Sequence, residues 1–120
     1  MSQIVDLSML VQLSGNDKKY IYDVLSIFID STTKTLKKLN KLVKQGTNFQ
    51  DISSTAHSMK SGVGIVQILG MLDELIATEK MAKAEGNIDE IRGHVQTATT
   101  LFENALPVLL EEKAANKVSE

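Results

Sequence analysis

The sequence contains no cysteine and no tryptophan, and aromatic residues make up only 4% of its 120 residues. Without cysteine there is no disulfide bond, no thiolate metal site and no cysteine nucleophile. The absence is also typical of proteins from a reducing compartment, so we expect a cytoplasmic protein. Because aromatic side chains are scarce, aliphatic residues and methionine must fill the core, which favours helices packed on helices over a β-sandwich.

Long apolar segments are missing as well. No apolar run approaches the roughly 20 residues that a membrane-spanning helix needs, and the segment MSQIVDLSML lacks the pattern of a signal peptide. The net charge of −2 provides no general attraction for nucleic acid. With 120 residues there is room for one core, so residues 1–120 are predicted to form a single domain. The Met1 start and the polar tail favour a free-standing protein.

Five helices are predicted from apolar residues spaced three and four apart and from residues that cap helix ends. Only one proline and seven glycines interrupt the chain, so these helices can be long. In chain order they comprise a short helix capped by Asp6, a second from Asn16 or Asp17 to Gly46, a third opened by a capping box of Thr47 and Gln50, a fourth from near Leu69 to Glu85, and a fifth opened by Asn87 and Glu90.

Two further expectations concern the second half of the chain. Pro107 lies inside the fifth helical pattern, where it should bend or end the helix because it has no N–H to donate. The tail, residues 113–120, is polar and is expected to be frayed. The fourth helix should stop at Gly86, and the side chains expected to face inward from it are Leu72, Leu75, Ile76 and Ala82.

Together these patterns predict an all-α protein. The connections are short, so successive helices should be antiparallel neighbours in an up-down four-helix bundle with a short extra N-terminal helix. The sequence shows no strand alternation, and a core of four helices is complete in a monomer.

His57 is separated from the apolar stripe of the third helix. At about 100° per residue it lies roughly 160° from Met59, which is on that stripe. The imidazole should therefore project into solvent, with Lys60 one turn away as its neighbour. The residues expected to share its surface strip are nearly all small: Ser53, Ser54, Ser61, Gly64 and Ile68.

This arrangement suits phosphoryl transfer. An imidazole near neutral pH is partly unprotonated and can attack as a nucleophile, and a lysine one turn away can offset charge on the transferred oxygens. The small residues would let another protein close over the ring. The simpler interpretation is that His57 is an ordinary solvated histidine, but two glycines inside the helix, Gly62 and Gly64, each cost about 1 kcal/mol relative to alanine. That cost favours a function.

The segment TAHSMKSGVG, from Thr55 to Gly64, resembles the signature of histidine-containing phosphotransfer (HPt) domains, commonly Ala-His-Ser-Leu-Lys-Gly followed by small residues. The resemblance implies that His57 accepts the phosphoryl group and that Lys60 is its electrostatic helper. It also implies a phosphorelay protein without kinase activity or a cofactor of its own. Its partners would be receiver domains of response regulators, which bring Mg²⁺, and a hybrid sensor histidine kinase.

The sequence departs from the HPt pattern at two positions. Ser61 replaces the glycine that usually follows the lysine, and Gln67 replaces a second glycine. Ser61 is small enough to keep the surface open. Gln67 could add a hydrogen bond at the docking surface or change how the third helix ends, so it bears on the choice of partner. Docking is expected around His57, with apolar contact from Ile68 and Ile65.

Other features allow different functions. His94 is predicted at the edge of the core without a role, and the histidines are too few and too far apart for a metal site. Two alternatives remain: an adaptor that binds receiver or kinase domains without being phosphorylated, and a metal- or ligand-binding bundle with a buried polar cluster. Five lysines should form a solvated face of the second helix or steer acidic receivers: Lys34, Lys37, Lys38, Lys41 and Lys44.

Overall fold

The computed structural model describes residues 4–118, which form five helices and a two-stranded antiparallel ribbon. The protein is therefore predominantly α-helical, as the sequence predicts. The elements are β1 (Val5–Asp6), α1 (Ser8–Ser14), α2 (Lys18–Gln45), α3 (Phe49–Ile65), β2 (Gln67–Ile68), α4 (Met71–Lys83) and α5 (Ile88–Ala115).

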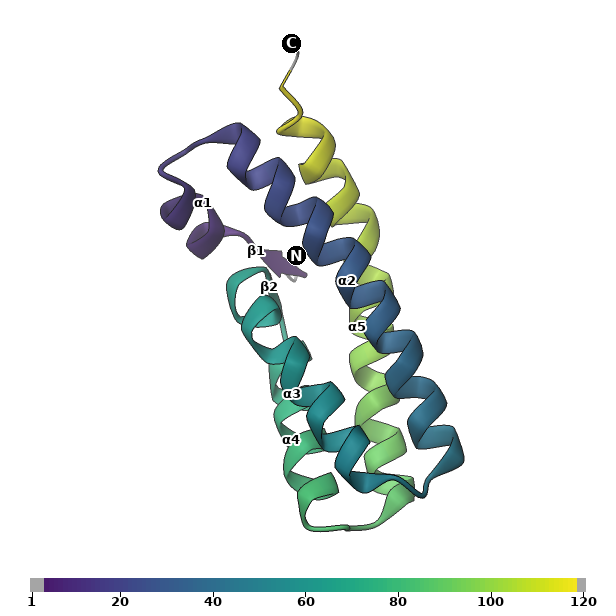
Figure 1. Ribbon diagram of the computed structural model, residues 1–120. Helices are drawn as coiled ribbons and strands as arrows, with labels where there is room; N and C mark the ends of the chain where they lie inside the picture. The colour runs from purple at the N-terminus through teal and green to yellow at the C-terminus, as the bar shows by residue number, and fades with distance from the viewer. Residues whose placement is uncertain (1–3, 119–120) are drawn as a thin grey trace.

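The four longer helices lie side by side, and each runs in the opposite direction to the one before it (Figure 1). Contacts join α2 to α3, α3 to α4, α4 to α5 and α5 back to α2, so the four helices enclose one core. Aliphatic residues dominate this core, and the largest side chains with almost no exposure are Leu10, Leu25, Leu39, Ile52, Met71, Leu75, Ile91 and Leu109. No helix within residues 4–118 is long and apolar enough to cross a membrane.

Three of the predicted helix ends are confirmed. The Asp17 side chain caps α2 by accepting a hydrogen bond from the Tyr20 N–H at 3.2 Å, and Gly46 ends it in the left-handed conformation with φ +70°. Asn87 caps α5. The cap of α3 differs from the prediction by one residue, because Asn48 and not Thr47 accepts the hydrogen bond from the first turn.

The ribbon of β1 and β2 was not predicted. Val5 pairs with Ile68 and Asp6 pairs with Gln67, so the N-terminal segment closes over the chain that follows α3. Two-residue strands are too short to show alternation in a sequence. Asp6 consequently lies in β1, and the residue at the N-cap of α1 is Leu7. The Asp6 carboxylate still accepts a hydrogen bond from the Ser8 N–H at 3.0 Å.

Two predictions about α4 are wrong. Ile76 was expected to face inward but is 44% exposed. The helix ends at Lys83, and Glu85 takes the left-handed conformation, with φ +50°, before Gly86 is reached. The other three inward predictions agree with the structure, since Leu75 and Ala82 are buried and Leu72 packs against the core.

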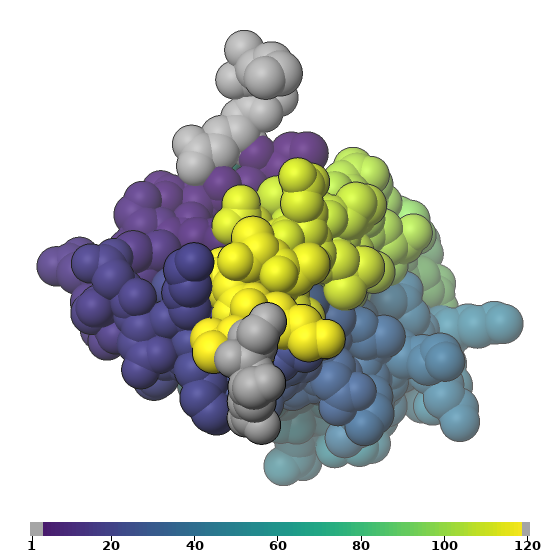
Figure 2. All heavy atoms as spheres, turned by 90° about the horizontal axis from the view of Figure 1, so that it is seen from above, coloured from purple at the N-terminus to yellow at the C-terminus, as the bar shows by residue number. Residues whose placement is uncertain are grey.

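Pro107 does not end α5, which continues to Ala115. Pro107 and Glu103 are both exposed, so water can satisfy the carbonyl that loses its partner to the proline. Residues 113–115, predicted as part of a frayed tail, are also helical, and the Lys113 Nζ lies 5.3 Å from the centre of the Tyr22 ring. Figure 2 shows this end of the molecule, with the end of α5 (yellow) against the N-terminal part of the chain (purple and dark blue).

The two glycines of α3 differ in what surrounds them. A Cβ atom on Gly62 would lie 3.3 Å from Cδ1 of Phe28, so this glycine lets α2 and α3 approach each other. A Cβ on Gly64 would meet nothing within 4 Å. Gly62 therefore serves helix packing, whereas Gly64 keeps an open surface.

The lysines on α2 form a solvated face, as predicted. All five side chains are exposed: Lys34, Lys37, Lys38, Lys41 and Lys44. Lys34 pairs with Asp30 on the same helix at 3.1 Å, between two exposed groups. Such a pair contributes about 0.5 kcal/mol or less.

Candidate functional site: a histidine held by a buried glutamate

His57 lies on the exposed side of α3, as its position relative to the apolar stripe predicts. Its side chain is 66% exposed, whereas Ala56, Met59 and Val63 on the same helix are buried in the core. The ring therefore projects from a helix whose other face is fixed by packing.

The ring is held from the neighbouring helix. Nδ1 of His57 lies 2.8 Å from Oε2 of Glu79 on α4. A carboxylate can only accept in this contact, so Nδ1 carries the hydrogen when Glu79 is ionised. In a neutral imidazole the lone pair then resides on Nε2, the nitrogen that Glu79 does not contact.

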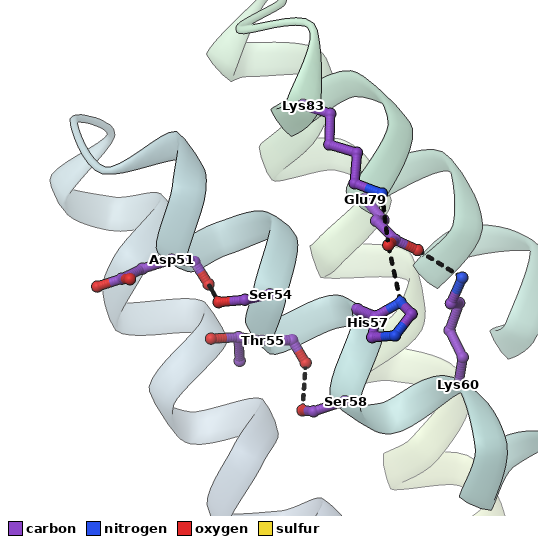
Figure 3. A network of polar contacts seen from close by, with 8 residues as sticks. All are labelled: Asp51, Ser54, Thr55, His57, Ser58, Lys60, Glu79 and Lys83. Carbon is purple, nitrogen blue, oxygen red and sulfur yellow. Dashed lines mark hydrogen bonds and ion pairs between the residues drawn. The ribbon is translucent and has the colours of Figure 1, made fainter.

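Two lysines share the same carboxylate (Figure 3). Nζ of Lys60, one turn beyond His57 on α3, lies 2.5 Å from Oε1 of Glu79. Nζ of Lys83, one turn further along α4, lies 3.2 Å from Oε2. The Glu79 side chain is only 8% exposed. A nearly buried carboxylate is thus surrounded by two ammonium groups and an imidazole, which compensates its loss of water.

The electrostatics keep Glu79 ionised. The hydrogen bond from Lys60 is the largest cause that lowers the pKa of Glu79 to about 2, from 4.5 for a free side chain. Burial acts in the opposite direction, and the hydrogen bonds from Lys83 and His57 lower the pKa further. At neutral pH, Glu79 is therefore a fixed negative charge beside Nδ1.

Sequence reasoning missed Glu79, although the pattern of α4 contains a signal. Leu75 and Ala82 are buried, and Glu79 lies four residues after the first and three before the second, on the same face. A glutamate on an apolar stripe needs a partner. The partners are on α3, so only the packing of the two helices identifies them.

The residues predicted to surround His57 do not all reach the surface. Ser54 and Ser61 are exposed, and Gly64 and Gln67 are partly exposed. Ser53 is 6% exposed and Ile68 is 2% exposed, so their assignment to an accessible strip is wrong.

The two errors have different causes. Ser53 borders the depression between α3 and α4 that also contains His57, but little of its side chain reaches the surface. The position predicted for Ile68 assumes a helix longer than α3, which ends at Ile65. In β2 the Ile68 side chain joins the core. Ile65, named as a second apolar contact, is partly buried against the core.

A depression opens beside His57 between α3 and the end of α4. Ser54 and Glu79 lie in its wall together with the first turn of α3, and so does Lys83, whereas Lys60 does not. The space next to the imidazole is therefore bounded by one of the two lysines only.

His94 occupies the edge of the core, as expected, and it also contacts a glutamate of α4. Its Nδ1 lies 2.7 Å from Oε2 of Glu74, and the two side chains are 36% and 25% exposed. Within the described part of the chain, no lysine or arginine pairs with Glu74 and no cluster of three or more His, Cys, Asp or Glu residues could hold a metal ion.

Comparison with known proteins gives a limited likeness. No protein-family model matches the sequence. The chain is 29% identical over 108 residues to the virulence sensor protein BvgS of Bordetella pertussis, and equally to that of Bordetella bronchiseptica. The matched region covers 87% of this chain but only 9% of either relative, so the chain spans about a tenth of their length.

Proposed function

We propose that this protein is a histidine phosphotransfer protein of a two-component phosphorelay. His57 would accept a phosphoryl group from the phosphoaspartate of one receiver domain and pass it to the aspartate of another. The observation that carries this proposal is an exposed imidazole whose Nδ1 is held 2.8 Å from a nearly buried carboxylate.

The contact with Glu79 makes Nε2 the attacking atom. Nε2 attacks phosphorus, the N–P bond forms, and the P–O bond to the receiver aspartate breaks, releasing its carboxylate. The ring gains positive charge during this step while Nδ1 keeps its hydrogen. The Glu79 carboxylate stabilises that charge and fixes the ring, as the aspartate of a Ser-His-Asp triad does for its histidine.

The remaining chemistry belongs to the partner. Catalysis of phosphoryl transfer consists mostly of positioning and charge neutralisation, and the receiver would supply Mg²⁺ for the transferred oxygens. We infer no kinase activity of this chain itself. In the return step a receiver aspartate attacks phosphorus, and His57 leaves as neutral imidazole with its hydrogen still on Nδ1.

The wider setting follows from the same reasoning. Similarity to sensor proteins supports a place in signal transduction, with a hybrid sensor histidine kinase and response regulators as partners. We interpret the four long helices as an antiparallel up-down bundle that works as a monomer in the cytoplasm. A partner would dock around His57, where the exposed or partly exposed residues of the predicted strip are Ser54, Ser61, Gly64 and Gln67.

The adaptor alternative predicts the same docking without chemistry. It is the stronger alternative, because a helical surface can bind a receiver whether or not His57 is modified. The metal- or ligand-binding alternative is weaker. The buried charged group at the site is Glu79, and a metal ion would have to displace the ammonium groups of Lys60 and Lys83 from it.

The decisive experiment is phosphoryl transfer from a panel of labelled receiver domains to the wild type, His57→Gln and His94→Gln. We expect acid-labile, base-stable label on the wild type and on His94→Gln, and none on His57→Gln. His94 is a matched control because it makes the same contact with a glutamate.

Stability must be measured on the same variants. His57→Gln should change the free energy of unfolding by no more than about 0.5 kcal/mol, as exposed positions usually do. A loss of several kcal/mol would mean that the substitution acts through folding. Receiver binding without label on any variant would favour the adaptor.

A further inference from the structure

The two lysines on Glu79 are held differently. Lys60 makes the shorter contact, 2.5 Å to Oε1, and its side chain is 29% exposed. Lys83 makes the longer contact, 3.2 Å to Oε2, and its side chain is 67% exposed. Lys83 is also the last residue of α4. Exchanging its contact with Glu79 for another anion therefore needs little rearrangement.

Their positions relative to the imidazole differ too. Lys83 and Nδ1 of His57 contact the same oxygen, Oε2, whereas Lys60 contacts the other one. Figure 3 shows the two lysines approaching Glu79 from different sides. Lys83 also lies in the wall of the depression beside His57, where Lys60 does not. A group seated in that depression would lie beside Lys83, the one lysine in its wall, which also contains Glu85.

The groups around Glu79 carry an excess of positive charge that could attract an anion. Two ammonium groups face one carboxylate, so with a neutral imidazole the cluster carries one surplus positive charge. A phosphoryl group on Nε2 would bring up to two negative charges close to it. The cation that is held less tightly and is more exposed is the one that such a group would attract.

We propose that Lys83 is the lysine that contacts the phosphoryl group on His57, while Lys60 remains on Glu79 and keeps it in place. This deepens the phosphotransfer function proposed above and assigns to Lys83 the electrostatic role that the HPt resemblance gives to Lys60. During transfer the Lys83 Nζ leaves Oε2 and donates hydrogen bonds to the phosphoryl oxygens. Glu79 retains Lys60 and the Nδ1–H of His57.

The test uses phosphoramidate, a small donor that needs no receiver. Nε2 attacks its phosphorus, the P–N bond of the donor breaks, and ammonia leaves. The rate of labelling and the titration of the phosphoryl group are measured in a His94→Gln background, so that only His57 can react. The variants are Lys83→Ala, Lys83→Arg, Lys60→Ala and Lys80→Ala. Lys80 is the matched control, because it is an exposed lysine on α4 that lies outside the Glu79 cluster.

We expect Lys83→Ala to react about tenfold more slowly, since one of the charges that stabilises the developing phosphoryl oxygens is lost. Lys83→Arg should restore most of the rate and Lys80→Ala should not change it. A second readout is the ³¹P NMR titration of the phosphorylated protein. Loss of a neighbouring ammonium should raise the pH at which the phosphoryl group takes up its proton in Lys83→Ala alone.

Equal rates and equal titrations for Lys83→Ala and Lys80→Ala would overturn the assignment. So would a larger shift of the phosphoryl titration in Lys60→Ala than in Lys83→Ala. The test of Lys83 is independent of the test of the phosphorelay. If phosphoramidate labels His57 in a way that depends on Lys83 but no receiver domain labels it, the inference about Lys83 holds and the phosphorelay function is wrong.

Discussion

The protein contains two His–Glu pairs with nearly the same contact. Nδ1 of His57 lies 2.8 Å from Oε2 of Glu79, and Nδ1 of His94 lies 2.7 Å from Oε2 of Glu74. Both glutamates are on α4, and the histidines reach them from α3 and α5. The distance between histidine and carboxylate therefore does not distinguish a candidate site from an ordinary surface contact.

The surroundings of the two pairs are opposite. At the first, the imidazole is 66% exposed and the carboxylate 8% exposed. At the second, the values are 36% and 25%, and no lysine approaches Glu74 among the described residues. An exposed imidazole beside a buried, fixed charge is suited to the transfer between proteins that is proposed above. A half-covered pair without further charges is suited to joining two helices.

The two pairs should differ most in their effect on the rate of phosphoryl transfer when the carboxylate of each is replaced by an amide. Glu79→Gln removes the charge that stabilises the developing imidazolium. Its amide can donate to Nδ1 as well as accept from it, so the hydrogen is no longer fixed on Nδ1. Transfer from a labelled receiver should slow about tenfold to a hundredfold. Glu74→Gln should leave the rate unchanged. Equal rates for wild type and Glu79→Gln would show that the pair at His57 has no role in transfer.

Acid should weaken the first pair in a defined pH range. The pKa of Glu79 is lowered to about 2 in the folded protein, from 4.5, so its ionised form stabilises the fold above pH 4.5. That contribution, on the order of 1–3 kcal/mol, is lost as the pH falls from about 4.5 to about 2. Measured by urea unfolding, the free energy of unfolding should fall less between about pH 6 and about pH 3 in Glu79→Gln than in the wild type. An equal fall of the unfolding free energy in the two proteins would contradict a lowered pKa of Glu79.

Removing the Lys60 ammonium should make the surroundings of the His57–Glu79 pair more like those of the His94–Glu74 pair. Lys60→Ala takes away the shortest contact of Glu79, 2.5 Å, so the carboxylate should hold the imidazole less firmly. We expect transfer to slow about threefold to tenfold, with the fold retained in circular dichroism. An unchanged transfer rate would remove Lys60 from the mechanism.

The smallest effect is expected at the second pair. His94→Gln removes a partly exposed histidine–carboxylate contact between α4 and α5, which contributes no more than about 1 kcal/mol. Thermal unfolding should therefore shift by only a few degrees. A larger loss would mean that His94 has a structural role that its exposure does not indicate.

The sequence predicts the helices well because their signals are local. Asp17, Gly46 and Asn87 act within one turn of their own positions, and the structure confirms all three ends. The exposure of His57 follows from the same short-range periodicity. The wrong position of Ile68 and the unseen ribbon arise from the pairing of two segments far apart in the chain.

Glu79 shows the same limit within the site. Its place on an apolar stripe can be read from the sequence, but its partners cannot, because Lys60 and His57 belong to another helix. His57 and Lys60 could therefore be predicted from the sequence, whereas Glu79 and Lys83 could not. The carboxylate that distinguishes His57 from an ordinary surface histidine emerges only when α3 and α4 are packed together.

The close approach at Gly62 has a consequence for how related sequences can vary. The space that a Cβ would need there is bounded by the ring of Phe28, at 3.3 Å. Alanine would favour the helix by about 1 kcal/mol but would require the Phe28 ring to shift by a few tenths of an ångström. Positions 28 and 62 should therefore co-vary, with a larger residue at 62 accompanied by a smaller one at 28. Position 64 has no such neighbour, so selection there would come from the molecules that bind this surface.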